Sequence, residues 1–281
     1  YEKGVAAFEN EKYREAFGDF VKIEKRSPNY RETGVLKNSA LELGTFTIAL
    51  LPFENSTPIS NLESKISAYS LEALTSVQDP FLKIVDRDHM QLILEEQKLG
   101  LTGIIDENSA VTVGELIGAQ AIVTGTVLGF EQQSGRPQSS AREGYEQYKV
   151  KQLDKETNKY YYETKYKKTS YKEFTNSNRV TVSFQFKVIS LKTGEVMLSK
   201  IVDKETSDSV NYGEYAGDLS LLYPSTMRGV NTSSSAKKQL NNLINANRQL
   251  KSVDELSNLV FQDVSKLMKS DIEKLMLDLV K

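Results

Sequence analysis

Apolar and small residues recur at helical spacing over the first 30 residues, in two blocks separated by a polar break. The first block contains Gly4, Ala7 and Phe8. The second block places its apolar side chains on one helical stripe: Tyr13, Ala16, Phe20 and Ile23. Pro28 follows this stripe, and proline cannot continue a helix. The pattern predicts a helical hairpin over about residues 1–30.

The hydrophobic period changes after residue 44. Three runs rich in apolar and β-branched residues predict strands at 45–51, 81–85 and 121–130. Between them lie helical stripes at about 62–77, 88–100 and 108–117, and Ser60 with Glu63 predicts a capping box for the first of these helices. Strands that alternate with helices are typical of an α/β arrangement.

Apolar and polar residues alternate from 180 to 188, which predicts a strand with one buried face. The chain then turns at 192–195, where Gly194 suits a positive φ, and a second strand returns over 196–202. A last helix begins at a capping box of Ser252 and Glu255 and carries an apolar stripe to Leu279. Polar stretches occupy about 131–178 and 203–251.

These elements predict an α/β (α+β) fold, with a mixed or antiparallel sheet packed with helices. We expect a helical hairpin domain at 1–40 and an α/β domain at 41–281, which carries the two polar stretches as insertions. No run approaches the roughly 20 apolar residues of a spanning helix. The chain begins at Tyr1 rather than Met, so we expect a signal or lipid-anchor segment to lie outside the observed chain.

Composition narrows the chemistry. The 281 residues contain no Cys and a single His, His89, which excludes disulfides, thiolate zinc sites and sites with several histidines. The motif residues Asp86 and Arg87 are interpreted as a solvated ion pair, and His89 as a surface residue. We therefore predict no catalytic residues, no cofactor and no metal. The net charge of −2 gives no bulk field that favours nucleic acid, and no nucleic-acid partner is expected.

The spacing in the N-terminal hairpin resembles one tetratricopeptide repeat. Gly4, Ala16, Phe20 and Pro28 fall where that repeat places its small, small, aromatic and proline positions. A single repeat does not stand alone, so the hairpin either packs on the next domain or belongs to a longer array. The alternative is an amphipathic helix pair that belongs to no family.

Three segments, 81–97, 116–131 and 182–199, together resemble the curli secretion channel family (CsgG-like). The first is a strand followed by Asp86-Arg87 and a helix. The second has the pattern Gly-Ala-x-Ala followed by an apolar strand, and the third is a hairpin that turns at Thr-Gly-Glu. The resemblance covers roughly residues 45–205 and the last helix. Each piece alone is a weak motif, whereas their order is fairly specific.

The resemblance implies an envelope lipoprotein in the periplasm, tethered to the outer membrane by a lipidated N-terminus outside this chain. Channel members of the family form rings, and each subunit donates two β-hairpins to a membrane-spanning barrel. Related small domains act as soluble lipoproteins, including activators of peptidoglycan synthases. The implied partners are therefore envelope proteins, the chain's own subunits in a ring, or peptidoglycan-linked machinery. The two insertions lie where the channel's hairpins would be.

The first insertion concentrates tyrosine and lysine. Seven of the 14 tyrosines lie between residues 145 and 171, together with many lysines. Alternation on both sides of a turn at 154–158 predicts a long hairpin, with Tyr160, Tyr162, Thr164 and Tyr166 on one face. Val150 and Leu153 are the only aliphatic residues between 145 and 174. A lipid-facing strand needs an aliphatic row, and Lys at the bilayer midplane costs about 2–4 kcal/mol, so this composition disfavours a pore.

We therefore interpret the hairpin as a protein contact surface, because Tyr is enriched at interfaces. Its predicted interaction residues are Tyr145, Tyr148, Tyr160, Tyr162, Tyr166, Tyr171, Lys165 and Lys167. The function predicted is a non-enzymatic scaffold or regulator of envelope assembly or secretion. Three alternatives stay open: a solvated hairpin whose lysines only keep an edge soluble, a subunit of a ring-forming secretion channel, and a hydrolase using Glu54, Asp86 and Asp88.

Overall fold

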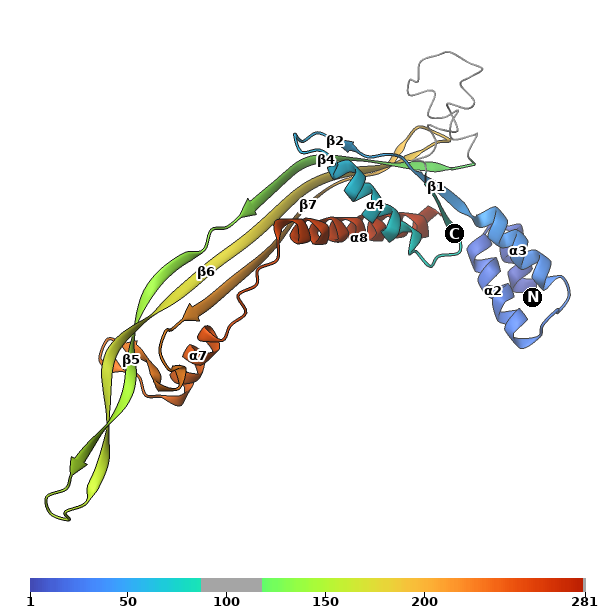
Figure 1. The fold of residues 1–281 in the computed structure, drawn as a ribbon. Coiled ribbons are helices and arrows are strands. Elements are labelled where there is room, and N and C mark those ends of the chain that lie inside the picture. Colours follow the sequence, from blue (N-terminus) through green and yellow to red (C-terminus); the bar gives the residue numbers. More distant parts are fainter. Residues whose placement is uncertain (87–117, 280–281) are drawn as a thin grey trace. The chain divides into compact units, whose positions relative to one another are not determined.

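The structure is a computed structural model, and it describes residues 1–86 and 118–279. The chain divides into two compact units (Figure 1). The first comprises Tyr1–Glu131, Thr181–Glu205 and Asn258–Lys281, and the second comprises Gln132–Val180 and Thr206–Ser257. The helices predicted at 88–100 and 108–117, together with His89 and Asp88, lie outside the described residues. The predicted boundary between 1–40 and 41–281 stays a prediction.

The chain begins with three helices, α1 (Glu2–Glu9), α2 (Tyr13–Arg26) and α3 (Thr33–Gly44). The first two confirm the predicted hairpin, and α2 ends two residues before Pro28. Their core contains Ala7, Ala16, Phe20 and, from α3, Ala40. Gly4 is required here, since a Cβ at this position would lie 2.9 Å from the Phe20 ring. The sequence pattern did not predict α3.

The sheet of the first unit begins with parallel strands. Strand β1 (Phe46–Leu50) lies between β3 (Leu82–Asp86) and β4 (Ala121–Ser134), and the two-residue β2 (Glu54–Asn55) also pairs with β4. Strands β1, β3 and β4 match the three predicted strands in place, whereas β2 was not predicted. Their central residues are buried on both faces: Ile48, Ala49 and Leu50 of β1 are at most 2% exposed. This burial explains why the strands read as continuous apolar runs.

Two helices, α4 (Leu62–Thr75) and α8 (Val253–Leu279), pack together against this sheet (Figure 1). A buried hydrogen bond of 3.1 Å joins the hydroxyls of Ser70 and Ser265. The ring of Phe261 on α8 stacks on Phe130 of β4, with centroids 5.6 Å apart. The helix α4 does not begin with the predicted Ser60–Glu63 capping box. That prediction is wrong, because the residue before the helix is left-handed and the Glu63 carboxylate instead accepts a 3.0 Å hydrogen bond from an asparagine amide.

Strands β6 (Tyr160–Ser190) and β7 (Val196–Glu214) form the hairpin that was predicted to turn at 192–195, and Gly194 in this turn has a φ of 70°. Both strands extend far into the stretches that the sequence marked as polar insertions. The core end of β6 has the predicted alternation, with Val180, Val182 and Phe184 at most 3% exposed. The Phe184 ring lies against Gly125, where a Cβ would meet it at 2.4 Å.

The second unit contains β5 (Gln138–Leu153), a short 3-10 helix (Leu219–Leu221), β8 (Leu222–Thr226), β9 (Gly229–Val230) and α7 (Ser234–Ile244). Hydrogen-bonded neighbours follow the order β3-β1-β4-β6-β5-β8-β9, with β2 beside β4 and β7 beside β6. The sheet is mixed and is packed with helices, which confirms the predicted α+β fold. The capping box at the start of α8 is also confirmed. The backbone N–H of Ser252 donates to the Glu255 carboxylate, and the backbone N–H of Glu255 donates to the Ser252 hydroxyl.

Candidate interaction site on the β5–β6 hairpin

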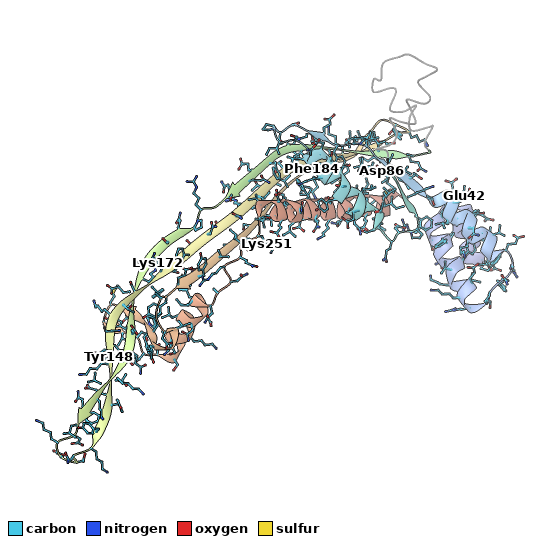
Figure 2. The ribbon with its side chains drawn as sticks, in the orientation of Figure 1. Glu42, Asp86, Tyr148, Lys172, Phe184 and Lys251 are labelled. Carbon is cyan, nitrogen blue, oxygen red and sulfur yellow. The ribbon has the colours of Figure 1, made fainter. Side chains whose placement is uncertain are left out.

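The predicted Tyr- and Lys-rich hairpin is formed by β5 and the first half of β6. The register is unbroken from Gln138 opposite Thr175 to Leu153 opposite Tyr160. At the turn, the N–H of Asp154 donates to the carbonyl of Lys159 at 3.0 Å. The Asp154 carboxylate accepts bonds from the Thr157 hydroxyl and from backbone N–H groups, which lowers the pKa of this carboxyl. Figure 2 shows the side chains on both sides of this ribbon, including Tyr148 and Lys172.

The register decides which residues share a face, because directly opposed residues of an antiparallel pair point to the same side. One face between Tyr145 and Lys168 is named the lysine face. It consists of Tyr145, Gln147, Lys149, Lys151 and Leu153 from β5, and Tyr160, Tyr162, Thr164, Tyr166 and Lys168 from β6. It carries three lysines and no carboxylate. The first carboxylate toward the base on this side is Glu143, opposite Ser170.

The opposite side of the same segment is named the ion-paired face. It consists of Glu146, Tyr148, Val150 and Gln152 from β5, and Tyr161, Glu163, Lys165 and Lys167 from β6. Two lysines are balanced by two carboxylates: Lys165 lies 3.2 Å from Glu163, and Lys167 lies 3.1 Å from Glu146. The Tyr161 hydroxyl donates to Gln152 at 3.0 Å, and Gln152 also donates to the Glu163 carboxylate. The polar groups of this face therefore largely satisfy one another.

The base of the lysine face is covered by other parts of the second unit. Strand β8 pairs with β5 so that Tyr223 lies opposite Tyr145. The rings of Tyr166 and Tyr223 meet edge to face with centroids 5.3 Å apart, and Lys237 of α7 lies 3.8 Å from the centre of the Tyr223 ring. Tyr145 and Tyr166 are half-buried as a result. These two tyrosines stabilise the attachment of the hairpin to β8.

The tip of the lysine face has no such cover among the described residues. Tyr160 and Tyr162 are each 65% exposed, and Leu153 is 45% exposed. The Lys151 ammonium lies 4.1 Å from the centre of the Tyr160 ring, which is a cation–π contact on the surface. Lys149, Lys151 and Lys168 are exposed, and none of the ion pairs in the described part of the chain involves them.

Seven of the eight predicted site residues therefore separate into three groups, and Tyr171 is the eighth. Tyr160 and Tyr162 are exposed at the tip of the lysine face, while Tyr145 and Tyr166 pack at its base. Tyr148, Lys165 and Lys167 belong to the ion-paired face. The predicted site omits Lys149, Lys151 and Leu153. Side chains alternate between the two faces of a strand, so this alternation along β5, together with the position of the turn, could have identified them.

Tyr171 lies nearer the base and is half-buried. Burial raises the pKa of its hydroxyl, and the Glu173 carboxylate adds to that increase. Arg142 lies 2.5 Å from Glu173 and is the main reason that the pKa of Glu173 is lowered. This arrangement makes Tyr171 a packed, structural residue, and the interaction role predicted for it stays a prediction.

The carboxylates of the hydrolase alternative lie in separate strands. Glu54 is exposed in β2 opposite Thr126, and Asp86 ends β3 opposite Leu50. Asp88 lies outside the described residues. Within residues 1–86 and 118–279, no group of three or more His, Cys, Asp or Glu side chains is placed to hold a metal ion. No helix in that part of the chain is long and apolar enough to cross a membrane.

Solved structures similar to this chain include three from bacteria. Lipoprotein GNA1162 from Neisseria meningitidis is 12% identical, with 57% of this chain and 80% of that chain covered and a TM-score of 0.32. A PelC dodecamer from Paraburkholderia phytofirmans is 7% identical, with coverages of 79% and 88% and a TM-score of 0.33. The C-terminal domain of LpoB from Salmonella enterica is 11% identical, with coverages of 57% and 82% and a TM-score of 0.28. Likenesses this loose assign no function.

No curated protein matches the chain. The family described as "Curli production assembly/transport component CsgG" matches residues 44–270, which is well over half of the sequence. The matched range includes the parallel strands, the long β6–β7 hairpin and most of α8. The chain therefore belongs to the family of the curli production assembly/transport component CsgG.

Proposed function

We propose that the chain is a non-enzymatic periplasmic component of envelope assembly or secretion, which binds protein partners through the tip of the β5–β6 hairpin. Membership of the CsgG family supports an envelope-associated function. Tethering to the outer membrane by a lipidated N-terminus, as the resemblance implies, is part of this proposal. Its partners would be other envelope proteins, including peptidoglycan-linked machinery, or further copies of the chain.

The observation that carries the proposal is the exposure of two tyrosines on a surface with few aliphatic residues. Tyr160 and Tyr162 present rigid apolar rings with a hydroxyl at 65% exposure each. A two-stranded ribbon is only marginally stable in water, and a partner that covers these rings would stabilise it. Tyr and Arg dominate the binding energy of many interfaces, whereas most other contact residues contribute little.

Site-specific photo-cross-linking in growing cells tests the proposal. A benzophenone amino acid at Tyr162 is expected to give adducts with an envelope protein or with the chain itself, identified by mass spectrometry. The same amino acid at Tyr166, which packs against Tyr223, is the matched control and is expected to give few adducts. Tyr160→Ser with Tyr162→Ser should abolish the complex. Equal adducts at both positions, or none at Tyr162, would contradict the proposal.

A secretion-channel subunit is the second candidate, and the family's description as an assembly and transport component favours it. The length of β6 and β7, which run through both polar insertions, is compatible with it. Reconstitution of the full chain into planar bilayers tests this candidate. A steady single-channel conductance together with ring-shaped particles in electron micrographs would support it, and their absence would leave the contact-surface role.

A further inference from the structure

The two faces of the hairpin tip differ in charge, and this difference points to the chemistry of a partner. Resting on the proposed function, we propose that the lysine face docks an acidic, extended protein segment with carboxylates at alternate positions. The ion-paired face has two carboxylates for its two lysines. The lysine face has three lysines between Tyr145 and Lys168 and no carboxylate, so its charge is uncompensated.

The spacing of the charged groups favours an extended protein segment. Lys149 and Lys151 are two residues apart on one strand, which places their Cα atoms about 6.8 Å apart at the usual rise of a strand. Carboxylates at alternate positions of a second extended chain have this same spacing. Tyr160 and Tyr162 lie opposite Leu153 and Lys151, so the rings flank the lysines along the same line. A lipid headgroup layer is fluid and imposes no such spacing.

Exposure and hydrogen bonding show where such a segment would lie. The base of the face is already occupied, since Tyr166 packs on Tyr223 and β8 pairs with β5. The open part contains Leu153, Tyr160 and Tyr162 at 45%, 65% and 65% exposure. An acidic segment here would cover the two rings and place its carboxylates beside ammonium groups that lack an ion pair within the described chain. Apolar contact and charge would act together.

Peptide binding to the full chain tests the inference. The probes are an eight-residue peptide of alternating Glu and Thr, a peptide of the same composition with four Glu followed by four Thr, and an alternating Lys and Thr peptide. Binding is measured by fluorescence anisotropy, and the site is located by backbone amide shifts over residues 147–166. The alternating acidic peptide is expected to bind most tightly, and its affinity is expected to fall as salt is raised.

Two matched double variants locate the face. Lys149→Gln with Lys151→Gln should weaken binding about tenfold, the effect of losing two favourable exposed charge pairs. Lys165→Gln with Lys167→Gln removes the same charge from the ion-paired face and should change binding less than about threefold. Circular dichroism of both variants checks that the fold is retained.

Three results of the peptide experiments would overturn the inference: equal binding of the block peptide, equal effects of the two double variants, or no binding of any acidic peptide. Vesicles of anionic phospholipid form a further arm. Flotation that depends on Lys149 and Lys151, without peptide binding, would assign the face to lipid headgroups and overturn the inference. The cross-linking experiment separates it from the proposed function. If adducts at Tyr162 survive Lys149→Gln with Lys151→Gln, only the acidic-segment inference fails.

Discussion

One ion pair joins helix α2 to the segment between α4 and β3, and Asp79→Asn tests its contribution. Arg14 of α2 donates to both carboxylate oxygens of Asp79, at 3.1 and 2.8 Å. The backbone N–H of Phe81 donates to the same carboxylate at 3.0 Å, and the Arg14 guanidinium lies 4.9 Å from the centre of the Phe81 ring. The side chains of Arg14 and Asp79 are 28% and 18% exposed.

The magnitude follows from this partial burial. A hydrogen bond to a charged group contributes about 1.5–3 kcal/mol, and an asparagine side chain in place of Asp79 would keep the shape while losing the charge and one acceptor. We expect Asp79→Asn to lower the free energy of unfolding by about 2 kcal/mol, or the melting temperature by about 4–8 °C. Asp263→Asn is the matched control. Asp263 is 56% exposed and 3.6 Å from Lys266, so its loss should cost less than about 0.5 kcal/mol.

The effect should depend on pH with a defined sign. Partial burial raises the pKa of Asp79, but the hydrogen bonds from Arg14 and Phe81 and the charge of Arg14 lower it more, and the net pKa is lowered. A carboxyl with a lowered folded pKa adds stability above its unfolded pKa of about 3.9, and this stability is lost as pH falls through the folded value. The difference between wild type and Asp79→Asn should therefore shrink in acid.

Urea unfolding of wild type and both variants, followed by circular dichroism at pH 7, 5 and 3, measures the loss of stability in Asp79→Asn, the loss in Asp263→Asn and the dependence of the first on pH. The reasoning is refuted if Asp79→Asn is as stable as Asp263→Asn at pH 7. It is also refuted if the difference between wild type and Asp79→Asn is as large at pH 3 as at pH 7. A double variant that also carries Arg14→Gln should cost less than the sum of the two single changes, because the two residues share one interaction.

Three further results are expected. Gly125→Ala should destabilise the chain by about 1–3 kcal/mol in urea unfolding, since its Cβ would lie 2.4 Å from a buried phenylalanine ring, whereas Gly129→Ala, with 3.6 Å of space, should be nearly neutral. Ser252→Ala should cost about 0.5–2 kcal/mol by removing the cap of α8, which thermal melting would report. Arg142→Gln should move the pKa of Glu173 up toward its ordinary value in a nuclear magnetic resonance titration, since Arg142 is the main cause of its lowering.

The strands and the last helix could be predicted because their burial follows the sequence period. Val180, Val182 and Phe184 are buried at every second position of β6. In α8, Val260, Val264 and other apolar residues at helical spacing are buried, so the sequence stripe and the packed face coincide. Where apolar residues recur with the same period as the buried positions of an element, the local sequence is sufficient to predict that element.

Helix α3 was missed because packing rather than propensity holds it. Glycine is a poor helix former, and α3 contains Gly34 and ends at Gly44. Gly44 is nevertheless required, since a Cβ there would lie 2.7 Å from Tyr13 and 2.8 Å from the Phe81 ring. Ala40 is fully buried against the first two helices. These reasons are tertiary contacts, which no single window of sequence contains.

Helix α7 and strand β8 of the second unit were missed for a different reason. Helix α7 carries a short apolar stripe of Ala236, Leu240, Leu243 and Ile244 within a stretch rich in Ser and Asn, and of these side chains Leu240 alone is fully buried. Strand β8 has five residues and includes Pro224, which lies opposite Gly144 of β5. Proline usually argues against a strand and is tolerated where its missing N–H is not needed. Because the stretch 203–251 is polar in composition, the sequence did not predict the helix and strand that it contains.

In the candidate site, the alternation of side chains along each strand is not sufficient to predict which residues share a face. Each arm of the hairpin divides into two faces by simple alternation, but which face of β5 joins which face of β6 depends on the register. With Leu153 opposite Tyr160, Lys149 and Lys151 share a side with Tyr160 and Tyr162. A slip of one residue would place those lysines on the same side as Glu163, Lys165 and Lys167 instead, and would separate them from Tyr160 and Tyr162. The acidic-segment inference is thus a statement about register, and the two lysine double variants test the register together with the partner.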